Sequence, residues 1–415
     1  MKIILAAKCV HPFHPFGGIQ KYVYNYAKFL AKEGVETEIV APLDKGKPRT
    51  EIYEGIKYTL LAPRIYQYLE YPIGWLGVHI FSLNLAKYLK NIEFDLLHTF
   101  DITGYQYLKR KKRKPVITHI FTDNYMCNSI PIWKLASFWG HNIDNIKRNK
   151  IAISPEAGKM TILKYPFQYF LKIKPIQYCL TKSDLVFSEQ EIFRREIIEL
   201  YNINPKKCHI APVGIDMSFI NSRLSENRIT RKAIGIMEND LVLLTVARLA
   251  ADKGVDKVIH AFIDIKRKLP NIKLIIIGSG YQEKEILKLI ADNRLKNDVF
   301  HFKNIPEEEL YGFYRISDIY ISALSFLASS ISALEAMACF LPIITTAQPW
   351  LVKNNENGIT LENNEPKSIS DAVIRLVEAG QLKQKGQISN RIAQDYDWKN
   401  IVRSAKQKYE QILSN

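Results

Sequence analysis

Short apolar runs recur along the chain, and each is followed by a loop and then by a helical pattern. Residues 241–247 (LVLLTVA) are apolar at nearly every position, which is typical of a strand covered on both faces of a sheet. Residues 2–7 and 273–278 (KLIIIG) repeat this pattern. Parallel strands need helical crossovers between them, so the alternation predicts an α/β fold built from doubly wound parallel sheets.

The length of the chain allows more than one domain. Its 415 residues are enough for two domains of ordinary size, each with a core of its own. With 47% hydrophobic and 24% charged residues, the composition is that of a globular protein. The five cysteines have no paired spacing, so we expect neither a disulfide framework nor a zinc site, as suits a reducing cytosol.

The chain is strongly basic. A net charge of +16 attracts polyanions, whether nucleic acid, an anionic membrane or phosphorylated substrates. Residues 109–114 (KRKKRK) form the most basic segment, which we interpret either as a solvated loop or as an electrostatic contact with anionic lipid. Nucleic-acid binding is disfavoured because no aromatic platform interleaves with this run.

Two segments combine aromatic residues with apolar ones. Residues 58–89 carry few charges, which fits a helix packed on a sheet or a partly exposed surface that touches a membrane or a lipid-linked acceptor. Residues 162–180 mix lysine with aromatics and fit a buried or a membrane-facing helix. No uninterrupted apolar run approaches ~20 residues, so we expect no transmembrane helix. Residues 1–8 (MKIILAAK) suit a first strand better than a signal peptide.

Two cations lie astride an expected strand-to-helix loop. Arg248 and Lys253 follow the run at 241–247, and a helix is expected to begin near Val255. The pair can reach one anion from two sides while helix N–H groups meet it end-on, although such surface residues are often only solvated. Gly17 and Gly18 precede another helical pattern, where they predict either a turn or a loop that approaches a ligand closely.

A second strand, loop and helix are expected between residues 318 and 339. Ser329 and Ser330 are available as N-caps of the helix, and Glu335 falls in its second turn. In a parallel sheet such a loop lies at the carboxyl end of the strand, where ligands bind. Glu335 is therefore expected close enough to the ligand to accept hydrogen bonds from its hydroxyl groups.

These motifs resemble the signature of the retaining GT-B glycosyltransferases, which include glycogen-, sucrose- and lipopolysaccharide-type transferases. In that family two glutamates, separated by seven residues, precede "AMA.G.P", and residues 335–344 (EAMACFLPII) match the second half. Residues 246–256 (VARLAADKGVD) resemble its "GRL...KG.D". Two positions differ, because Leu327 stands where the first glutamate is expected and Phe340 replaces the glycine.

The resemblance implies two Rossmann-like domains facing a central cleft. Residues 1–213 would bind the acceptor, residues 214–390 would bind the nucleotide-sugar, and residues 391–415 would form a helix returning to the first domain. Arg248 and Lys253 would clamp the donor diphosphate, and Glu335 would hold the ribose hydroxyls. The remaining implied contacts with donor or acceptor are His119, Gly17, Gly18, Gly278, Ser329 and Ser330.

The function implied is transfer of a sugar, with retention, from a nucleotide-sugar to a lipid-linked or envelope glycan acceptor. We expect a UDP- or GDP-sugar donor, no metal and no further cofactor, at the cytosolic face of a membrane. The alternative is an impaired GT-B protein, in which Leu327 cannot contact the sugar, that binds nucleotide or glycan or supports a partner transferase. A nucleic-acid-binding protein has only the net charge in its favour.

Overall fold

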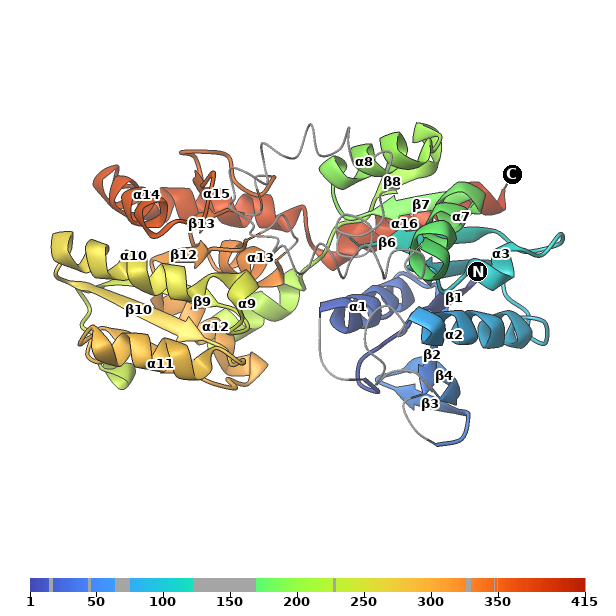
Figure 1. The fold of residues 1–415 in the computed structure, drawn as a ribbon, viewed down its shortest axis with the longest axis horizontal. Coiled ribbons are helices and arrows are strands. Elements are labelled where there is room, and N and C mark those ends of the chain that lie inside the picture. The colour runs from blue at the N-terminus through green and yellow to red at the C-terminus, as the bar shows by residue number, and fades with distance from the viewer. Residues whose placement is uncertain are drawn as a thin grey trace. The chain divides into compact units, whose positions relative to one another are not determined.

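The computed structural model describes residues 1–14, 18–43, 46–63, 75–121, 169–226, 229–325, 330–346, 348 and 350–414. These residues belong to two compact units (Figure 1). Unit 1 holds the described residues up to Val213 together with those from Trp398 onward, and unit 2 holds residues 214–397. Residues 64–74 and 122–168 include parts of the two aromatic segments, so those parts of the membrane-facing interpretation lie outside the described residues.

Unit 1 is built on an eight-stranded sheet in the order β3-β4-β2-β1-β5-β6-β7-β8. Every pairing is parallel except that of β3 with β4. The strands are β1 (Lys2–Ala6), β2 (Glu36–Leu43), β3 (Arg49–Tyr53), β4 (Ile56–Pro63), β5 (Leu96–Phe100), β6 (Val116–Ile120), β7 (Leu185–Ser188) and β8 (Cys208–Ile210).

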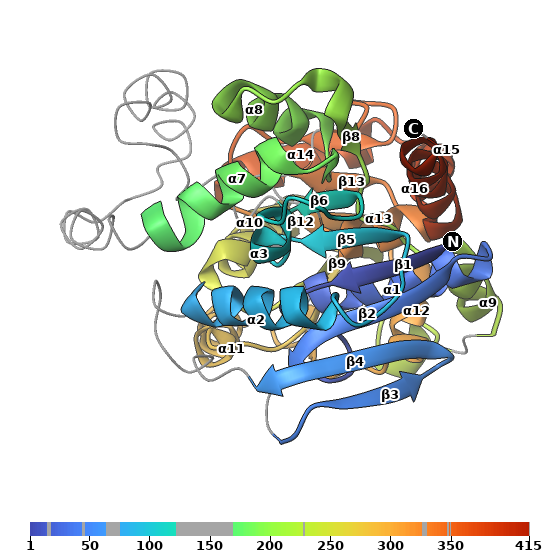
Figure 2. The same cartoon turned by 90° about the vertical axis from the view of Figure 1, so that its right-hand side faces the viewer.

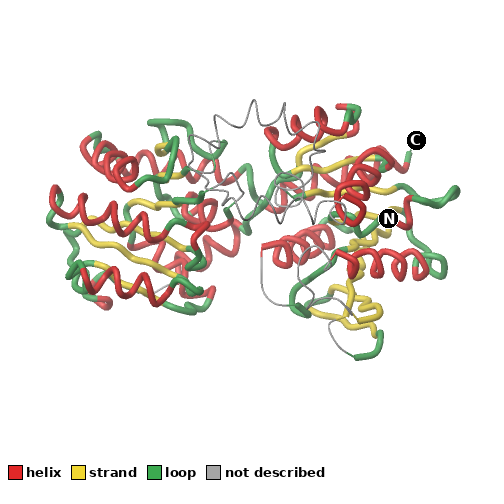
Figure 3. Tube along the Cα trace, in the orientation of Figure 1, coloured by secondary structure: helices red, strands yellow, loops and turns green. Residues whose placement is uncertain are grey.

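Helices cover both faces of this sheet, as the secondary-structure tube in Figure 3 also shows. Helix α1 (Gly18–Lys32) packs against α16 (Trp398–Leu413). Figure 2 shows α2 (Trp75–Tyr88), α3 (Tyr105–Leu108) and α7 (Lys174–Lys182) together in front of the strands. The remaining helical segments are η1 (Tyr169–Ile173), α8 (Glu191–Tyr201) and η2 (Pro205–Lys207).

The alternation of side chains along β5 explains how two different layers pack on one strand. His98 and Phe100 lie among the aromatic rings of α1 and α16, and the intervening Thr99 lies against Gly104 at the start of α3. The hydroxyl of Tyr409 lies 2.6 Å from both His98 Nδ1 and the Tyr26 hydroxyl. These buried hydrogen bonds fasten the C-terminal helix to unit 1.

Unit 2 is built on a fully parallel six-stranded sheet in the order β11-β10-β9-β12-β13-β14. Together the two sheets confirm the predicted α/β fold with doubly wound parallel sheets. The strands are β9 (Leu241–Val246), β10 (Ile272–Ile277), β11 (Val299–Phe302), β12 (Ile319–Ser322), β13 (Ile343–Thr345) and β14 (Gly358–Thr360).

Two apolar cores lie on the two faces of the unit 2 sheet. One is shared with α10 (Val255–Lys268), α11 (Glu283–Asp292) and α14 (Pro366–Glu378). The other is shared with α9 (Met217–Glu226), α12 (Glu307–Ile316), α13 (Ile331–Ala338) and α15 (Leu382–Gln394). Two short 3-10 turns complete the unit, η3 (Lys232–Ile234) and η4 (Ala251–Lys253).

The described residues contain neither a membrane-spanning helix nor a cluster of metal-binding side chains. None of their helices is at once long enough and apolar enough to cross a bilayer. In the same part of the chain, no three His, Cys, Asp or Glu side chains are grouped so that they could hold a metal ion.

The C-terminus of α13 explains why the related signature carries glycine at position 340. Phe340 has a φ of +63°, the left-handed conformation that favours glycine. Its N–H donates to the Met337 carbonyl, and the N–H of Leu341 donates to Ala336, so the helix ends in a Schellman motif. The Phe340 side chain is 49% exposed and therefore gains little from burial.

We therefore expect Phe340→Gly to stabilise the protein by about 1 kcal/mol, because it relieves the left-handed strain at little loss of packing. A thermal melt should show the unit 2 transition raised by about 2–4 °C. Phe340→Ala is the matched control, since it removes the ring but keeps the strained φ, and it should not stabilise. Equal destabilisation by both variants would contradict this account.

The buried histidines of unit 1 predict acid sensitivity. His98 and His119 are fully buried and stacked on each other. Burial lowers the pKa of His119 to about 3, and burial together with repulsion from His119 holds the pKa of His98 well below its usual range. In the unfolded chain both titrate near the ordinary value of about 6.5. Below that pH the unfolded state binds more protons, so stability falls as the pH falls toward 3.

We expect the free energy of unfolding to fall between pH 7 and pH 5 by roughly 2 kcal/mol more in the parent than in His119→Phe. Urea denaturation followed by circular dichroism at both pH values measures the difference. His260→Gln, which replaces an exposed histidine of α10, is measured beside His119→Phe as the matched substitution. The same pH dependence in parent and His119→Phe would show that His119 does not titrate as inferred.

Candidate functional site

Three loops at the carboxyl ends of β9, β10 and β12 approach one another so closely that only glycine fits at the contacts. A Cβ on Gly254 would lie 2.2 Å from the carbonyl oxygen of Ala323. A Cβ on Gly278 would lie 2.0 Å from the Ala247 oxygen, and one on Gly280 would lie 2.2 Å from the Leu249 oxygen. Gly254 and Gly278 also have positive φ values of +64° and +140°. The loops therefore form one edge whose geometry depends on these glycines.

Arg248 and Lys253 converge on this edge. Arg248 follows β9, and Lys253 closes the turn η4 just before α10 begins at Val255. Lys253 Nζ lies 3.1 Å from the Asp252 carboxylate, and the Arg248 guanidinium lies 3.7 Å from the same oxygen. The structure thus brings the predicted pair of cations together beside the N-terminus of a helix, an arrangement suited to an anion that carries two charges.

Asp252 is a site residue that the sequence analysis missed. Its carboxylate lies against both cations, which would otherwise repel each other, and its backbone oxygen accepts a hydrogen bond from Ser325 N at 3.0 Å. Asp252 therefore connects the cation pair to the loop that follows β12. Its position within the basic motif was visible in the sequence, but an acidic residue between two cations gives no sign of which one it contacts.

The loop after β12 is held by two further side chains. Asn364 Nδ2 donates to the Ala323 oxygen at 3.1 Å, and Thr346 Oγ1 donates to the Leu324 oxygen at 2.5 Å. Asn364 also accepts a hydrogen bond from Lys257 Nζ of α10 at 2.7 Å. Neither Asn364 nor Thr346 was predicted, because both act on backbone atoms of a loop that is distant from them in sequence.

Glu335 is a buried carboxylate on α13, and two phenols are directed at it. Tyr311 donates to Oε1 at 3.2 Å, and Tyr314 donates to Oε2 at 3.3 Å. Burial and the charge of Glu335 raise the pKa of both tyrosines above its usual range, so they stay protonated donors. A carboxylate has about four acceptor positions, and the two phenols each take one of them.

Ser330 takes the N-cap position that the sequence predicts for one of the two serines. Its Oγ accepts a hydrogen bond from Ala333 N at 3.3 Å and lies 2.9 Å from Ser332 Oγ. The side chain thus orients the first turn of α13. Ser329 and Leu327, which precede it, lie outside the described residues.

The predicted residues of unit 1 lie in a different setting. Gly18 opens α1, and, its chain neighbours and own helix backbone apart, no atom of the described residues lies within 4 Å of the position its Cβ would take. No close packing among the described residues therefore requires glycine there. Gly17 lies outside the described residues. His119, near the end of β6, is fully buried among aromatic rings with Nε2 3.5 Å from the Tyr22 hydroxyl. Its lowered pKa makes it a neutral imidazole, and its role toward a donor sugar stays a prediction.

Unit 2 also has a surface pocket of about 670 Å³ that is separate from these residues. Helices α9 and α12 and the end of β11 line it, with Arg223, Phe302 and Phe313 among its walls. None of the predicted site residues belongs to its lining, so it plays no part in the site described above.

Comparisons with known proteins place both halves of the chain in glycosyltransferase families. Residues 16–219 match the family model described as Glycosyltransferase Family 4, and residues 226–393 match Glycosyl transferases group 1. An uncharacterized glycosyltransferase of Methanocaldococcus jannaschii is 30% identical over 417 residues, which cover 96% of each chain.

Two further likenesses are more distant. The alpha-monoglucosyldiacylglycerol synthase of Acholeplasma laidlawii is 27% identical over 162 residues, 38% of this chain and 41% of that one. The structure of Anabaena HepE in complex with UDP-glucose matches with a TM-score of 0.66 and 15% identity, over 99% of this chain and 100% of that one. With the full-length relative and both family models in agreement, the chain belongs to the glycosyltransferases of the GT-B fold.

Proposed function

We propose that the protein transfers a sugar from a nucleotide-sugar, UDP- or GDP-linked, to a lipid-linked or envelope glycan acceptor with retention of configuration. The observation that carries the proposal is the pair of cations, Arg248 and Lys253, beside the N-terminus of α10 at the glycine-lined edge of unit 2. Glycosyl transfer from a nucleotide-sugar releases a nucleoside diphosphate, and this edge carries positive charge where such a leaving group can be bound.

Each part of the donor would meet a different group of unit 2. The diphosphate would meet Arg248, Lys253 and the first N–H groups of α10, so negative charge developing on the leaving group is stabilised without a divalent metal. Glu335, oriented by two phenol donors, would accept hydrogen bonds from the ribose hydroxyls. The base would lie beside Gly278, where glycine allows the loop after β10 to pack against the Ala247 carbonyl.

The nature of the acceptor and of the donor is inferred from related proteins and from the net charge of the chain. A lipid acceptor is suggested by the relative named alpha-monoglucosyldiacylglycerol synthase and by the net charge of +16, which favours peripheral contact with anionic membranes. A UDP-linked donor is suggested by the related fold in complex with UDP-glucose. We expect the acceptor to bind unit 1 and the reaction to take place at the cytosolic face of a membrane.

A second candidate function follows from Leu327. Leucine cannot accept a hydrogen bond, so the contact that the first glutamate of the family signature makes with the transferred sugar is missing. The protein would then be an impaired transferase fold that binds nucleotide or glycan, or supports a partner enzyme. A third hypothesis is that the protein is an active transferase whose donor is a deoxy-sugar, which lacks the hydroxyl that the glutamate would bind.

The cation pair is tested by Lys253→Ala. Loss of a charge-assisted interaction costs about 1.5–3 kcal/mol, so nucleoside diphosphate should bind roughly 10- to 100-fold more weakly to the variant, as measured by calorimetry. Lys268→Ala, at the exposed far end of α10, is the control and should bind as the parent does. Unchanged affinity in Lys253→Ala would remove the main support for the donor site.

Leu327→Glu separates the candidate functions. Release of nucleoside diphosphate from a panel of UDP-, GDP- and TDP-sugars is measured with and without extracted membrane lipids. An active enzyme should show acceptor-dependent release in the parent, lost in Lys253→Ala, and a deoxy-sugar enzyme should lose its preferred donor in Leu327→Glu. Turnover that appears only in Leu327→Glu would instead identify the parent as a transferase fold without activity. If the parent prefers a fully hydroxylated hexose as donor, the deoxy-sugar hypothesis is excluded.

A further inference from the structure

One helical layer of unit 1 contains basic residues and no acidic residue in its described parts. The layer consists of α2 with the residues that follow it (75–92), α3 with its following loop (105–114), and η1 with α7 (169–183). Lys and Arg occur two, six and three times in these three segments, and Asp and Glu do not occur. The segments pack on one another and lie on the same side of the sheet (Figure 2).

Most lysines of this layer are directed to solvent, whereas Lys172 is buried. Lys87 and Lys90 on and after α2, Lys111 and Lys112 in the loop, and Lys174 and Lys182 on α7 are all exposed. Among the described residues, none of these six ammonium groups forms an ion pair. The carboxylates next to the layer in sequence are Glu93, which is exposed, and Asp184, which pairs with Arg113. Neither forms an ion pair with these six lysines, so the surface presents an array of positive charges.

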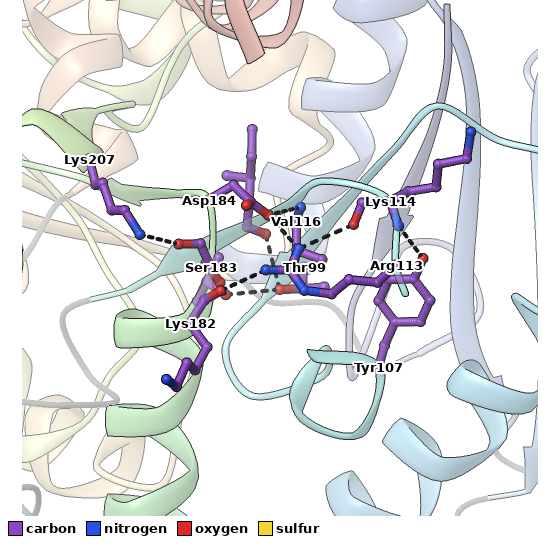
Figure 4. Close-up of polar contacts among 11 residues, drawn as sticks. Thr99, Tyr107, Arg113, Lys114, Val116, Lys182, Ser183, Asp184 and Lys207 are labelled. Atoms are coloured by element: carbon purple, nitrogen blue, oxygen red, sulfur yellow. Dashed lines mark hydrogen bonds and ion pairs between the residues drawn. The ribbon is translucent and has the colours of Figure 1, made fainter. Parts of the chain in front are cut away.

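Two basic side chains at the edge of the layer, Arg113 and Lys207, make contacts within unit 1 instead of facing solvent alone. Arg113 pairs with Asp184 at 2.5 Å and donates to the Lys182 oxygen at 2.9 Å, and Lys207 donates to the Ser183 oxygen at 3.2 Å (Figure 4). These contacts join the segments that enter β6, β7 and β8. Because the structural contacts use Arg113 and Lys207, the exposed lysines stay available for a partner.

Apolar side chains are exposed on the same layer. Leu83 on α2 is 46% exposed, and Phe170 on η1 is 61% exposed with Lys174 Nζ 5.8 Å from its ring. Lysines with long apolar stems next to exposed apolar groups are typical of surfaces that lie in the interface of a bilayer. The layer thus combines the two attractions that hold a peripheral protein on a membrane, charge and shallow apolar insertion.

We propose that the α2–α3–α7 layer docks on the surface of a membrane that contains anionic phospholipid. The layer is less suited to nucleic acid, because bases need exposed aromatic faces on which to stack. Tyr105 is covered by the Lys109 ammonium, 4.0 Å from its ring, and meets Tyr178 edge-on. Lysine, a flexible and strongly hydrated point charge, suits a diffuse anionic surface better than the fixed geometry of a phosphodiester backbone.

The proposal deepens the proposed function, since it assigns the membrane contact to a particular face of unit 1 and rests on the acceptor being membrane-borne. The two can fail separately. Binding to vesicles needs neither donor nor turnover, so Lys253→Ala should lose nucleotide affinity and still bind vesicles as the parent does. If Lys253→Ala loses vesicle binding as well, this face is not the contact.

The test is sedimentation of the full chain with vesicles of phosphatidylcholine alone or with about one-third phosphatidylglycerol. The patch variant carries Lys111→Gln, Lys112→Gln, Lys174→Gln and Lys182→Gln. Its control carries Lys268→Gln, Lys284→Gln, Lys288→Gln and Lys296→Gln, four exposed lysines of unit 2 with the same change in net charge. Circular dichroism and thermal melts establish that both variants fold.

We expect the parent to bind only the anionic vesicles and to be released when salt is raised to about 1 M, where the Debye length is about 3 Å. Each lysine near an anionic leaflet contributes a factor of about five, so the patch variant should bind at least about a hundredfold more weakly. The unit 2 control should lose at most a few-fold. Equal loss in both variants would show that net charge alone drives binding, and would overturn the proposal.

The contribution of exposed apolar side chains to vesicle binding is tested with a matched pair of variants. Leu83→Gln should weaken vesicle binding several-fold, and Leu287→Gln, on α11 with a side chain 44% exposed, should not. Two further results would overturn the proposal. The first is that the parent binds neutral vesicles as tightly as anionic ones. The second is that the parent binds double-stranded DNA more tightly than anionic vesicles, and that the four substitutions of the patch variant weaken this DNA binding. The second would identify the layer as a nucleic-acid surface.

Discussion

The close approach of backbone at the carboxyl ends of β9, β10 and β12 is the constraint on which the candidate site depends. At Gly254, Gly278 and Gly280 a carbonyl oxygen occupies the space that a side chain would need. With these contacts in place, the loop carrying Arg248 and Lys253 lies against its two neighbours. A larger residue at any of the three would separate the loops and with them the cations from the rest of the edge.

Side chains that the sequence analysis did not identify hold this arrangement. Asp252 balances the two cations, and Asn364 and Thr346 hold the loop after β12 through its carbonyl oxygens. Tyr311 and Tyr314 orient Glu335 in the same way on the other side of the sheet. Because the site residues are fixed by neighbours that never need to touch a ligand, a donor would meet groups that are already oriented, which lowers the cost of binding.

Unit 1 divides its two faces between different tasks. The α1 and α16 face is sealed by aromatic rings and by the hydrogen bonds of Tyr409, and its histidines are neutral because burial lowers their pKa. The α2, α3 and α7 face presents lysines and apolar groups to solvent. The strands supply both surfaces, since successive side chains point to opposite faces and each face can therefore be specialised independently.

The fold could be predicted from the sequence, because apolar runs separated by helical patterns leave few alternatives to parallel sheets covered by helices. The motifs also located Arg248, Lys253 and Glu335, since these residues lie at fixed distances from strand ends. Only the tertiary structure showed Asp252, Asn364 and the two tyrosines in contact with that site, and the acid-free helical layer of unit 1. Asp252 contacts its two cations locally, but its backbone bond from Ser325 N and the contacts of Asn364 and the tyrosines join segments distant in sequence. These distant contacts exist only once the sheets bring strand ends and helices side by side.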